Sequence, residues 1–265
     1  MKYLIHTLLA ALLLISCGST KRNESYNSFS RQLITMTYNI HHGAPDNSKE
    51  VNLKNIADVI KRSGAEVIAL QEVDINVPRS GNIDQIKELA NILGMKFYFS
   101  KSIDLNGGEY GVAILSKYKL KNVRNELLPM PMEGEQRSVA MATIELPGKV
   151  SIEFAATHLD LNVPNRLAQV EFLKKLSKDL NNPFFVAGDY NAEPTTSEMI
   201  KLKEEFNLSC MDSCPLTFPV KLPTKTIDYV AYNQLASVKF KMISSHAMTE
   251  EYASDHLPVV VAFKY

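Results

Sequence analysis

Short apolar runs recur along this chain, and several of them end in a polar side chain of a type that binds metals or phosphate. The residues in these positions are Asn39, Glu72, His158, Asp189, Asn191, Asp228, Asp255 and His256. A single polar residue after a strand means little, because a loop must follow. Repeated carboxylate, amide and imidazole groups in this position favour a fold in which many strand ends carry one site. Such groups hold hard cations and move protons.

The order of the surrounding motifs is informative. They are Thr-Tyr-Asn-Ile at Asn39, Leu-Gln-Glu-Val-Asp at Glu72, Thr-His-Leu-Asp at His158, Gly-Asp-Tyr-Asn at Asp189, Ile-Asp-Tyr-Val at Asp228 and Ser-Asp-His-Leu-Pro-Val at Asp255. In that order they resemble the endonuclease/exonuclease/phosphatase superfamily, the deoxyribonuclease-I-like hydrolases. The resemblance runs from about residue 32 to residue 265 and implies a metal-dependent phosphoesterase.

Residue patterns predict alternating strands and helices early in the chain and mostly strands later. Strands are expected near 33–40, 66–70, 95–100, 111–116, 139–146, 151–157, 184–187, 226–232, 238–244 and 258–263, and helices near 52–63, 83–93, 164–180 and 195–206. This pattern indicates an α/β arrangement of mixed sheets with helices outside. The resemblance implies a four-layered sandwich, in which two mixed β-sheets pack face to face with helices on the outer faces.

The first residues are typical of an export signal. Lys2 precedes an apolar run and then Ser-Cys-Gly, a stretch too short to span a membrane as a mature helix. Leu-Ile-Ser-Cys17 also resembles a bacterial lipobox, in which Cys17 becomes lipidated; a plain signal peptide with an incidental cysteine is the alternative. We expect a signal peptide at 1–16, a lipidated N-terminus and tether at 17–31, a catalytic domain at 32–265, and a lipid-anchored location in the bacterial cell envelope, at the periplasmic or outer-membrane face.

The charge balance bears on the substrate. The chain has 29 Lys plus Arg and 29 Asp plus Glu, so removing Lys2 leaves 28 − 29 = −1. Nucleic-acid binders usually carry a basic excess or a basic stripe. Nucleic acid therefore remains a possible partner that the charge does not favour, although Lys117, Lys119, Lys121 and Arg124 form either a local patch or a solvated strand edge. We expect a monomer.

Cys210 and Cys214 stand four residues apart. In an oxidising envelope they are expected to form a small disulfide loop. The alternatives are free thiols and a metal site, and a metal site needs more ligands nearby than the sequence offers.

A divalent metal site follows from the resemblance, which assigns it to Asn39, Glu72 and Asp255. Glu72 emerges just past the apolar run Val-Ile-Ala-Leu, and a carboxylate there needs a partner. A surface glutamate is the alternative reading. The expected ion is Mg²⁺, with Mn²⁺ able to substitute.

Catalytic roles are also carried over from the resemblance. Asp189 matches the residue that orients and activates water, and Asn191 would position Asp189 or donate to a phosphate oxygen; an Asx-type turn is the alternative for this motif. Asp228 and His256 form an expected dyad, in which the carboxylate fixes the imidazole. His158 is a second expected catalytic histidine.

Two further residues complete the expected site. Arg137 resembles the family arginine that contacts phosphate, with a surface salt bridge as the alternative. Glu109 is expected to orient His158. Together these residues predict a phosphodiesterase that uses in-line attack of water on a nucleic acid, a nucleotide, or a phospholipid or inositol-phosphate head group. The alternative is an idle envelope lipoprotein that binds phosphate or glycans and keeps the fold.

Overall fold

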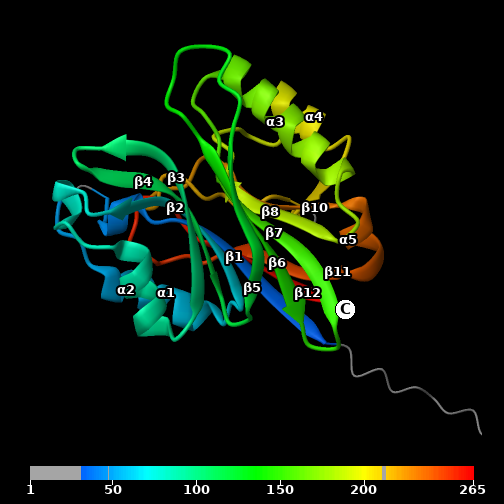
Figure 1. Ribbon diagram of the computed structural model, residues 1–265, viewed down its shortest axis with the longest axis horizontal. Helices are drawn as coiled ribbons and strands as arrows, with labels where there is room; N and C mark the ends of the chain where they lie inside the picture. Colours follow the sequence, from blue (N-terminus) through cyan, green and yellow to red (C-terminus); the bar gives the residue numbers. More distant parts are fainter. Residues whose placement is uncertain (1–30, 47, 211–212) are drawn as a thin grey trace, which may run out of the picture.

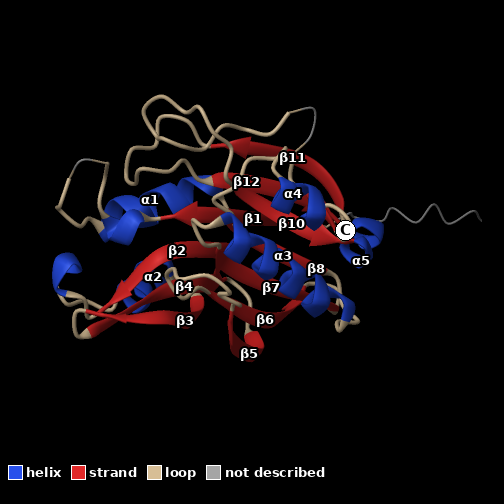
Figure 2. Ribbon diagram, turned by 90° about the horizontal axis from the view of Figure 1, so that it is seen from above, coloured by secondary structure: helices blue, strands red, loops and turns tan. Residues whose placement is uncertain are grey.

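The computed structural model describes residues 31–46, 48–210 and 213–265. The expected signal peptide, the lipidation site Cys17 and the tether up to residue 30 lie outside these residues. Two six-stranded sheets pack face to face, with helices on their outer faces (Figures 1 and 2). The four-layered α/β sandwich expected from the resemblance is therefore confirmed.

The first sheet has the strand order β11-β12-β1-β2-β4-β3. Its strands are β1 (Gln32–Asn39), β2 (Val67–Ile75), β3 (Lys96–Leu105), β4 (Gly108–Ser116), β11 (Lys241–Ala247) and β12 (Val259–Lys264). The pair β1–β2 is parallel and the other pairs are antiparallel, so the sheet is mixed.

The second sheet has the order β5-β6-β7-β8-β10-β9. Its strands are β5 (Leu120–Leu127), β6 (Ser138–Leu146), β7 (Val150–His158), β8 (Phe184–Asp189), β9 (Phe206–Leu208) and β10 (Asp228–Asn233). Here β7–β8 is the parallel pair, joined through helix α3. Edge strand β5 carries exposed Lys121 and Arg124, whose charges pair with Glu145 and Glu126. The basic patch is thus a solvated edge.

Alternation of side chains along the strands builds three cores. One row from each sheet points inward and forms the inter-sheet core, with Phe154, Phe185 and Phe263 among its largest members. The outer row of the first sheet packs under α1 (Leu53–Ser63) and α2 (Gln85–Leu93). The outer row of the second sheet packs under α3 (Val163–Lys178) and α4 (Ser197–Leu202).

Some elements differ from the expected ones. Strands β5 and β9, the helix α5 (Gln234–Lys239), and the 3₁₀ turns η1 (His41–Gly43) and η2 (Pro78–Ser80) were not predicted. The helix expected over 195–206 is only the short α4. Helix α3 buries Arg166 and Gln169, while Leu167 is half-buried. The two polar side chains point inward because they form hydrogen bonds with the loop before the helix. No helix within the described ranges is long and apolar enough to cross a membrane.

Candidate active site

The expected site residues lie where the inward-pointing rows of the two sheets reach the same end of the sandwich. The inward row ends in Asn39 on β1, in His158 on β7 and in Asp189 on β8, and it begins with Asp228 on β10. Successive side chains of a strand alternate between faces, so these residues share a face with the core residues two positions away. All four are buried.

Strand register holds three of these residues at one level. His158 pairs with Asp189 across the parallel β7–β8 ladder, and Asp189 pairs with Asp228 across the antiparallel β8–β10 ladder. Gly188 permits the close approach of β7, because a Cβ there would lie 2.3 Å from the Thr157 carbonyl oxygen. Backbone pairing alone therefore sets the spacing of the two carboxylates and the imidazole.

Asp189 is the centre of the cluster. Its Oδ1 accepts from the backbone N–H of Asn191 at 2.8 Å, and its Oδ2 accepts from Nδ2 of Asn39 at 3.1 Å. Nε2 of His158 lies 3.4 Å from the same Oδ2. Burial and the adjacent charge of Asp228 raise the pKa of Asp189 to about 7.

The two histidines are in opposite charge states at neutral pH. Burial alone would lower the pKa of His256, but the charges of Asp228 and Asp189 outweigh it and raise the pKa to about 10. Burial, together with the positive charges of Arg137 and His256, holds the pKa of His158 well below its usual range. His256 is therefore an imidazolium and His158 a neutral ring.

Asn191 connects the neutral histidine to the loop after β8. Its Nδ2 donates to the carbonyl oxygen of Leu159 at 2.9 Å and lies 3.1 Å from Nε2 of His158. Asn191 has a left-handed backbone (φ 49°), which lets one residue bond both the carboxylate and the imidazole. The Asx-type turn and the site are thus the same feature.

A bulge aims Glu72 at the site. The β2–β4 register shifts between Leu70 and Val73, and Glu72 has φ 58°, a strained value for a residue with a Cβ. The displaced carboxylate is half-buried and accepts from Nδ2 of Asn39 at 3.0 Å. The Asn39 amide thus joins Glu72 of the first sheet to Asp189 of the second.

Asp255 is linked to Asn39 through the hydroxyl of Ser254. The Ser254 hydroxyl donates to the Asn39 carbonyl at 2.7 Å and lies 3.3 Å from Oδ1 of Asp255. The three expected metal ligands are therefore neighbours in one network. Among the described acidic and histidine side chains, the set whose ligand atoms lie within 4.8 Å of one another is a second one, Asp189, Asp228 and His256. His256 Nδ1 is engaged by Asp228 Oδ2 at 3.0 Å, so this second set suits proton transfer better than metal binding.

Arg137 is buried directly before β6, and two of its nitrogen donors lack hydrogen-bond partners among the described residues. Its Nη1 lies 3.2 Å from a Glu135 carboxylate oxygen without hydrogen-bond geometry. Neither Nε nor Nη1 donates to any of the described residues. Buried donors without partners are costly, and two on one guanidinium favour an external anion as their acceptor.

The structure does not bring Glu109 to His158. The Glu109 carboxylate lies 3.5 Å from Lys101 Nζ on the exposed β3–β4 hairpin. His158 Nδ1 is buried and has no hydrogen-bond partner among the described residues. The expected orienting role of Glu109 is therefore wrong, since the β-hairpin directs its side chain to solvent.

Two residues that touch the site were not assigned from the sequence. Ser254 belongs to the Ser-Asp-His motif, so its place beside Asp255 was a usable signal. Phe218 packs its ring 4.7 Å from the His256 ring, centroid to centroid. It lies in a loop without periodic pattern, where no signal was available.

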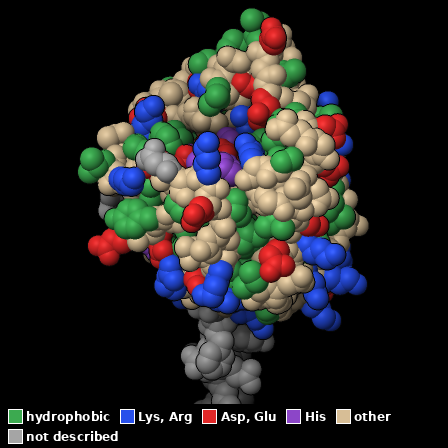
Figure 3. Space-filling model, turned by 90° about the vertical axis from the view of Figure 1, so that its left-hand side faces the viewer, with side chains coloured by type: hydrophobic (Ala, Val, Ile, Leu, Met, Phe, Trp, Pro, Cys, Tyr) green, Lys and Arg blue, Asp and Glu red, His purple; other side chains and the backbone are tan. Residues whose placement is uncertain are grey.

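The surface above this cluster is hollowed. Figure 3 shows histidine side chains at the bottom of a hollow with Lys and Arg side chains at its rim. The site thus combines carboxylates for a cation, a guanidinium with two donors that lack hydrogen-bond partners among the described residues, and a carboxylate–imidazolium pair, and its His256 lines a surface pocket. Such a set can bind a phosphate ester and move a proton beside it.

Comparison with known families decides the relationship. The sequence profile of the endonuclease/exonuclease/phosphatase family matches residues 36–256. The chain belongs to this family. Endonuclease/exonuclease/phosphatase proteins are hydrolases of phosphoester bonds and are generally metal-dependent.

Individual relatives cover nearly the whole domain. The uncharacterized protein YbhP of Escherichia coli K12 is 26% identical over 241 residues, 84% of this chain and 93% of YbhP. A Bacteroides thetaiotaomicron structure from the same family has a TM-score of 0.73 at 16% identity, covering 89% of this chain and 98% of that one. A mannosyl-6-phosphatase from that organism has a TM-score of 0.69 at 17% identity, covering 88% and 100%. These structural likenesses show the shared fold.

Proposed function

We propose that this endonuclease/exonuclease/phosphatase protein is a Mg²⁺-dependent phosphodiesterase that uses in-line attack of water. One observation carries the proposal. Arg137, a buried guanidinium with two donors that lack hydrogen-bond partners among the described residues, lies near His158, whose pKa it lowers, in the cluster that also holds the buried dyad of Asp228 and His256. A dianionic or monoanionic phosphate satisfies the first group while the second compensates charge that develops on the phosphate oxygens.

Asp189 is the residue that orients and deprotonates the attacking water in this proposal. Its pKa of about 7 suits a group that accepts a proton near neutral pH. Asn191 and Asn39 hold its two oxygens from different sides, so the carboxylate is fixed before substrate arrives. The neutral ring of His158 lies beside it and can share the proton.

His256 supplies positive charge at the reacting phosphate. Asp228 Oδ2 accepts from its Nδ1, which leaves Nε2 as the donor that faces Asp189. Because the imidazolium is already charged, it can donate to a phosphate oxygen without a prior proton transfer. Arg137 would bind the same phosphate in the ground state and in the transition state.

The donor chemistry of Glu72, Asn39 and Asp255 fits a hard cation. Two carboxylates and an amide oxygen are ligands that Mg²⁺ and Mn²⁺ accept, with the remaining positions left to water and phosphate. The Asn39 Oδ1 accepts from the His41 N–H at 3.1 Å, so Asn39 would have to exchange this hydrogen bond for the ion. A bound Mg²⁺ would supply Lewis-acid charge compensation at the phosphate. Glu72 is half-buried, and its backbone conformation is strained, which supports a binding role over that of an ordinary surface glutamate.

The cellular place of this activity is also part of the proposal. We infer attachment to the bacterial envelope through lipidated Cys17, on the sequence pattern alone. A lipid-anchored enzyme would meet scavenged nucleotides, phospholipid head groups or inositol phosphates.

A generic assay separates the proposal from the idle binding protein. Bis(p-nitrophenyl) phosphate is incubated with the protein and Mg²⁺, Mn²⁺ or EDTA. We expect release of p-nitrophenol with either metal and none with EDTA. A panel of plasmid DNA, RNA, sphingomyelin and inositol phosphates then ranks substrates. Phosphate binding without turnover on every substrate would favour the idle binding protein.

A further inference from the structure

A pocket of about 490 Å³ opens from one side of the candidate active site. His256 and Asn191 form the wall that it shares with the site. Its other walls include Phe218, Ile227 and Leu161, and its polar lining includes Lys225, Glu193 and Thr196. Pockets of this size enclose one small ring-sized group more readily than a polymer.

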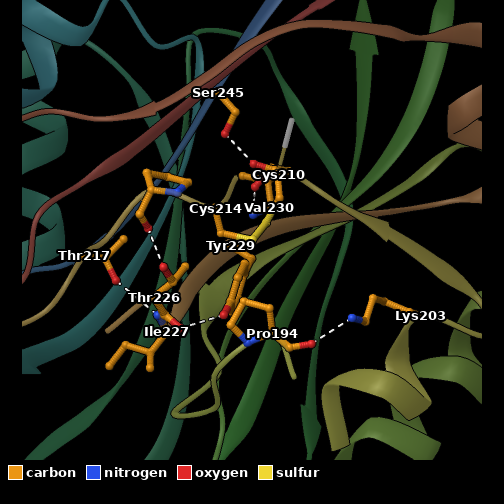
Figure 4. Close-up of a disulfide and its surroundings, with 12 residues drawn as sticks. Pro194, Lys203, Cys210, Cys214, Thr217, Thr226, Ile227, Tyr229, Val230 and Ser245 are labelled. Atoms are coloured by element: carbon orange, nitrogen blue, oxygen red, sulfur yellow. Dashed lines mark hydrogen bonds between the residues drawn. A yellow bond between two sulfur atoms is a disulfide. The ribbon is translucent and has the colours of Figure 1, made fainter. Parts of the chain in front are cut away.

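The loop that carries Phe218 and Lys225 is held in place on both sides. The structure pairs Cys210 with Cys214, as the sequence predicted, and this disulfide closes the start of the loop. Figure 4 shows two further ties: the Thr226 hydroxyl donates to the carbonyl of the proline after Cys214, and Ile227 N–H donates to Thr217 Oγ1. The pocket wall is therefore prearranged for its ligand.

The same loop is fastened to the catalytic motif. Thr217 and Phe218 donate their backbone N–H groups to the Lys225 carbonyl, at 2.7 and 3.1 Å, so the two arms of the loop form a small hairpin. Leu257 N–H donates to the Thr217 carbonyl at 2.8 Å, and the Phe218 ring lies against His256. A ligand seated on Phe218 would therefore stay beside the reacting phosphate.

Two charged side chains of the pocket are uncommitted. Lys225 and Glu193 are both exposed, and neither forms an ion pair with any residue in the described part of the chain. A hydroxyl group is the ligand group that suits both, since it can accept from an ammonium and donate to a carboxylate. The apolar surface of Phe218 suits the C–H face of a ring.

Resting on the proposed function, we propose that this pocket binds the alcohol half of the substrate and that this alcohol is a polyhydroxylated ring, either a sugar or a cyclitol. An acyl chain leaves both charges of Lys225 and Glu193 unused. A nucleic-acid duplex would bring a second row of phosphates toward the Glu193 carboxylate. Phe218, Lys225 and Glu193 are thus specificity-determining residues of the phosphoesterase.

The test compares ring alcohols with a generic ester. We measure kcat/KM for three phosphodiesters, namely glycerophosphoinositol, the glycerol diester of glucose 6-phosphate and bis(p-nitrophenyl) phosphate, with wild type, Lys225→Gln and Glu193→Gln. The first two substrates distinguish a cyclitol from a sugar. We expect at least one ring ester to be favoured, and each variant to lower the ratio of ring-ester to generic kcat/KM by about tenfold or more. Lys239→Gln, an exposed lysine on α5, is the matched control and should leave that ratio unchanged.

Several outcomes would overturn the inference. A ratio that stays constant in both pocket variants would do so, as would preferential cleavage of RNA, plasmid DNA or phospholipid vesicles over both ring esters. If wild type fails to hydrolyse even the generic ester, the proposed function fails by itself. Calorimetric titration with myo-inositol 1-phosphate and glucose 6-phosphate then decides the pocket: binding that weakens about tenfold in Lys225→Gln supports it, and absence of binding removes it.

Discussion

Nδ1 of His256 lies 3.0 Å from Oδ2 of Asp228, while Nε2 of the same ring lies 3.7 Å from Oδ2 of Asp189. One imidazolium therefore bridges two buried carboxylates. Because Asp189 and Asp228 are register partners on β8 and β10, the carboxylates cannot move apart without breaking the sheet. The arrangement links the proton acceptor of the proposed reaction to its source of positive charge.

The Asp228–His256 pair should act as one unit. His256→Ala and Asp228→Ala should each lower kcat by roughly 10²-fold, the size typical of a general acid–base or oxyanion contact. The double variant should have a kcat only slightly lower than that of the worse single variant, because either change already disables the pair. Steady-state kinetics on bis(p-nitrophenyl) phosphate measures this. Fully additive losses would show that the two residues work separately.

The buried carboxylate of Asp189 should make the metal-free protein sensitive to pH. Its pKa rises from an ordinary 3.8 to about 7 on folding, so its neutral form stabilises the fold below pH 3.8 and that stabilisation is lost as pH rises through about 7. Asp189→Asn should therefore melt at a progressively higher temperature than wild type across this window. Thermal melts in EDTA measure the difference.

His256→Gln provides the complementary control for the same experiment. The pKa of His256 rises from 6.5 to about 10, so its stabilisation is complete below pH 6.5 and is lost as pH rises through about 10. The Tm of wild type should fall toward that of His256→Gln as pH rises from 6.5 to about 10. Each kcal/mol of lost stability should lower Tm by roughly 2–4 °C. If the Tm of wild type and that of Asp189→Asn change in parallel with pH between 3.8 and about 7, the raised pKa of Asp189 is contradicted.

Glu72→Gln should weaken the metal site and leave the fold intact. The amide keeps the oxygen that accepts from Asn39 but removes the negative charge, so Mg²⁺ affinity should fall and kcat/KM should drop by roughly 10²-fold. The Tm of the metal-free protein should hold or rise, since a half-buried charge disappears. Glu109→Gln, on the exposed hairpin, is the matched control. Near-normal turnover of Glu72→Gln at low Mg²⁺ would refute the ligand assignment.

Arg137 should contribute mainly to substrate binding. Arg137→Ala should raise KM by about tenfold while kcat changes less, because the guanidinium contacts phosphate in the ground state too. Arg137→Lys should have a KM between those of wild type and Arg137→Ala, because an ammonium keeps the charge but lacks the planar fork of the guanidinium. Exposed Arg124→Ala serves as the control. A fall in Tm with unchanged KM would instead mark Arg137 as a structural residue.

Lipidation should depend on Cys17. Wild type produced in bacteria should fractionate with membranes, and Cys17→Ser should appear in the soluble fraction or keep its signal peptide. Fractionation followed by mass spectrometry of the N-terminal peptide checks the outcome. A soluble wild-type protein without lipid would leave the plain signal peptide as the reading of residues 1–16.

Periodicity and motif order predicted most of the fold and of the site, because strand ends are a local property. The positions of Asn39, Asp189 and Asp228 could be predicted in this way, since each borders an apolar run that must be buried. The direction of the Glu72 side chain could not be predicted, because it depends on a bulge that pairing with β4 creates. The resemblance placed Glu109 beside His158, but the β3–β4 hairpin directs its side chain elsewhere.

Irregular and polar segments account for the remaining differences. Phe218 reaches His256 through a loop whose shape comes from long-range hydrogen bonds and a disulfide. Inward polar groups on α3, such as Arg166 and Gln169, reverse the usual apolar pattern because they bond neighbouring loops. Neither the Phe218 loop nor the polar inward face of α3 produces a periodic pattern of apolar residues in the sequence.

Arg31 and Tyr265 exchange two backbone hydrogen bonds, at 3.0 and 2.9 Å, where β1 begins. Asn39 lies at the other end of that strand, roughly 25 Å away at the usual rise per residue. Arg31, at the start of the described chain, therefore lies at the end of the sandwich away from the candidate active site, so a tag or a solid support joined ahead of it would meet the fold away from that site.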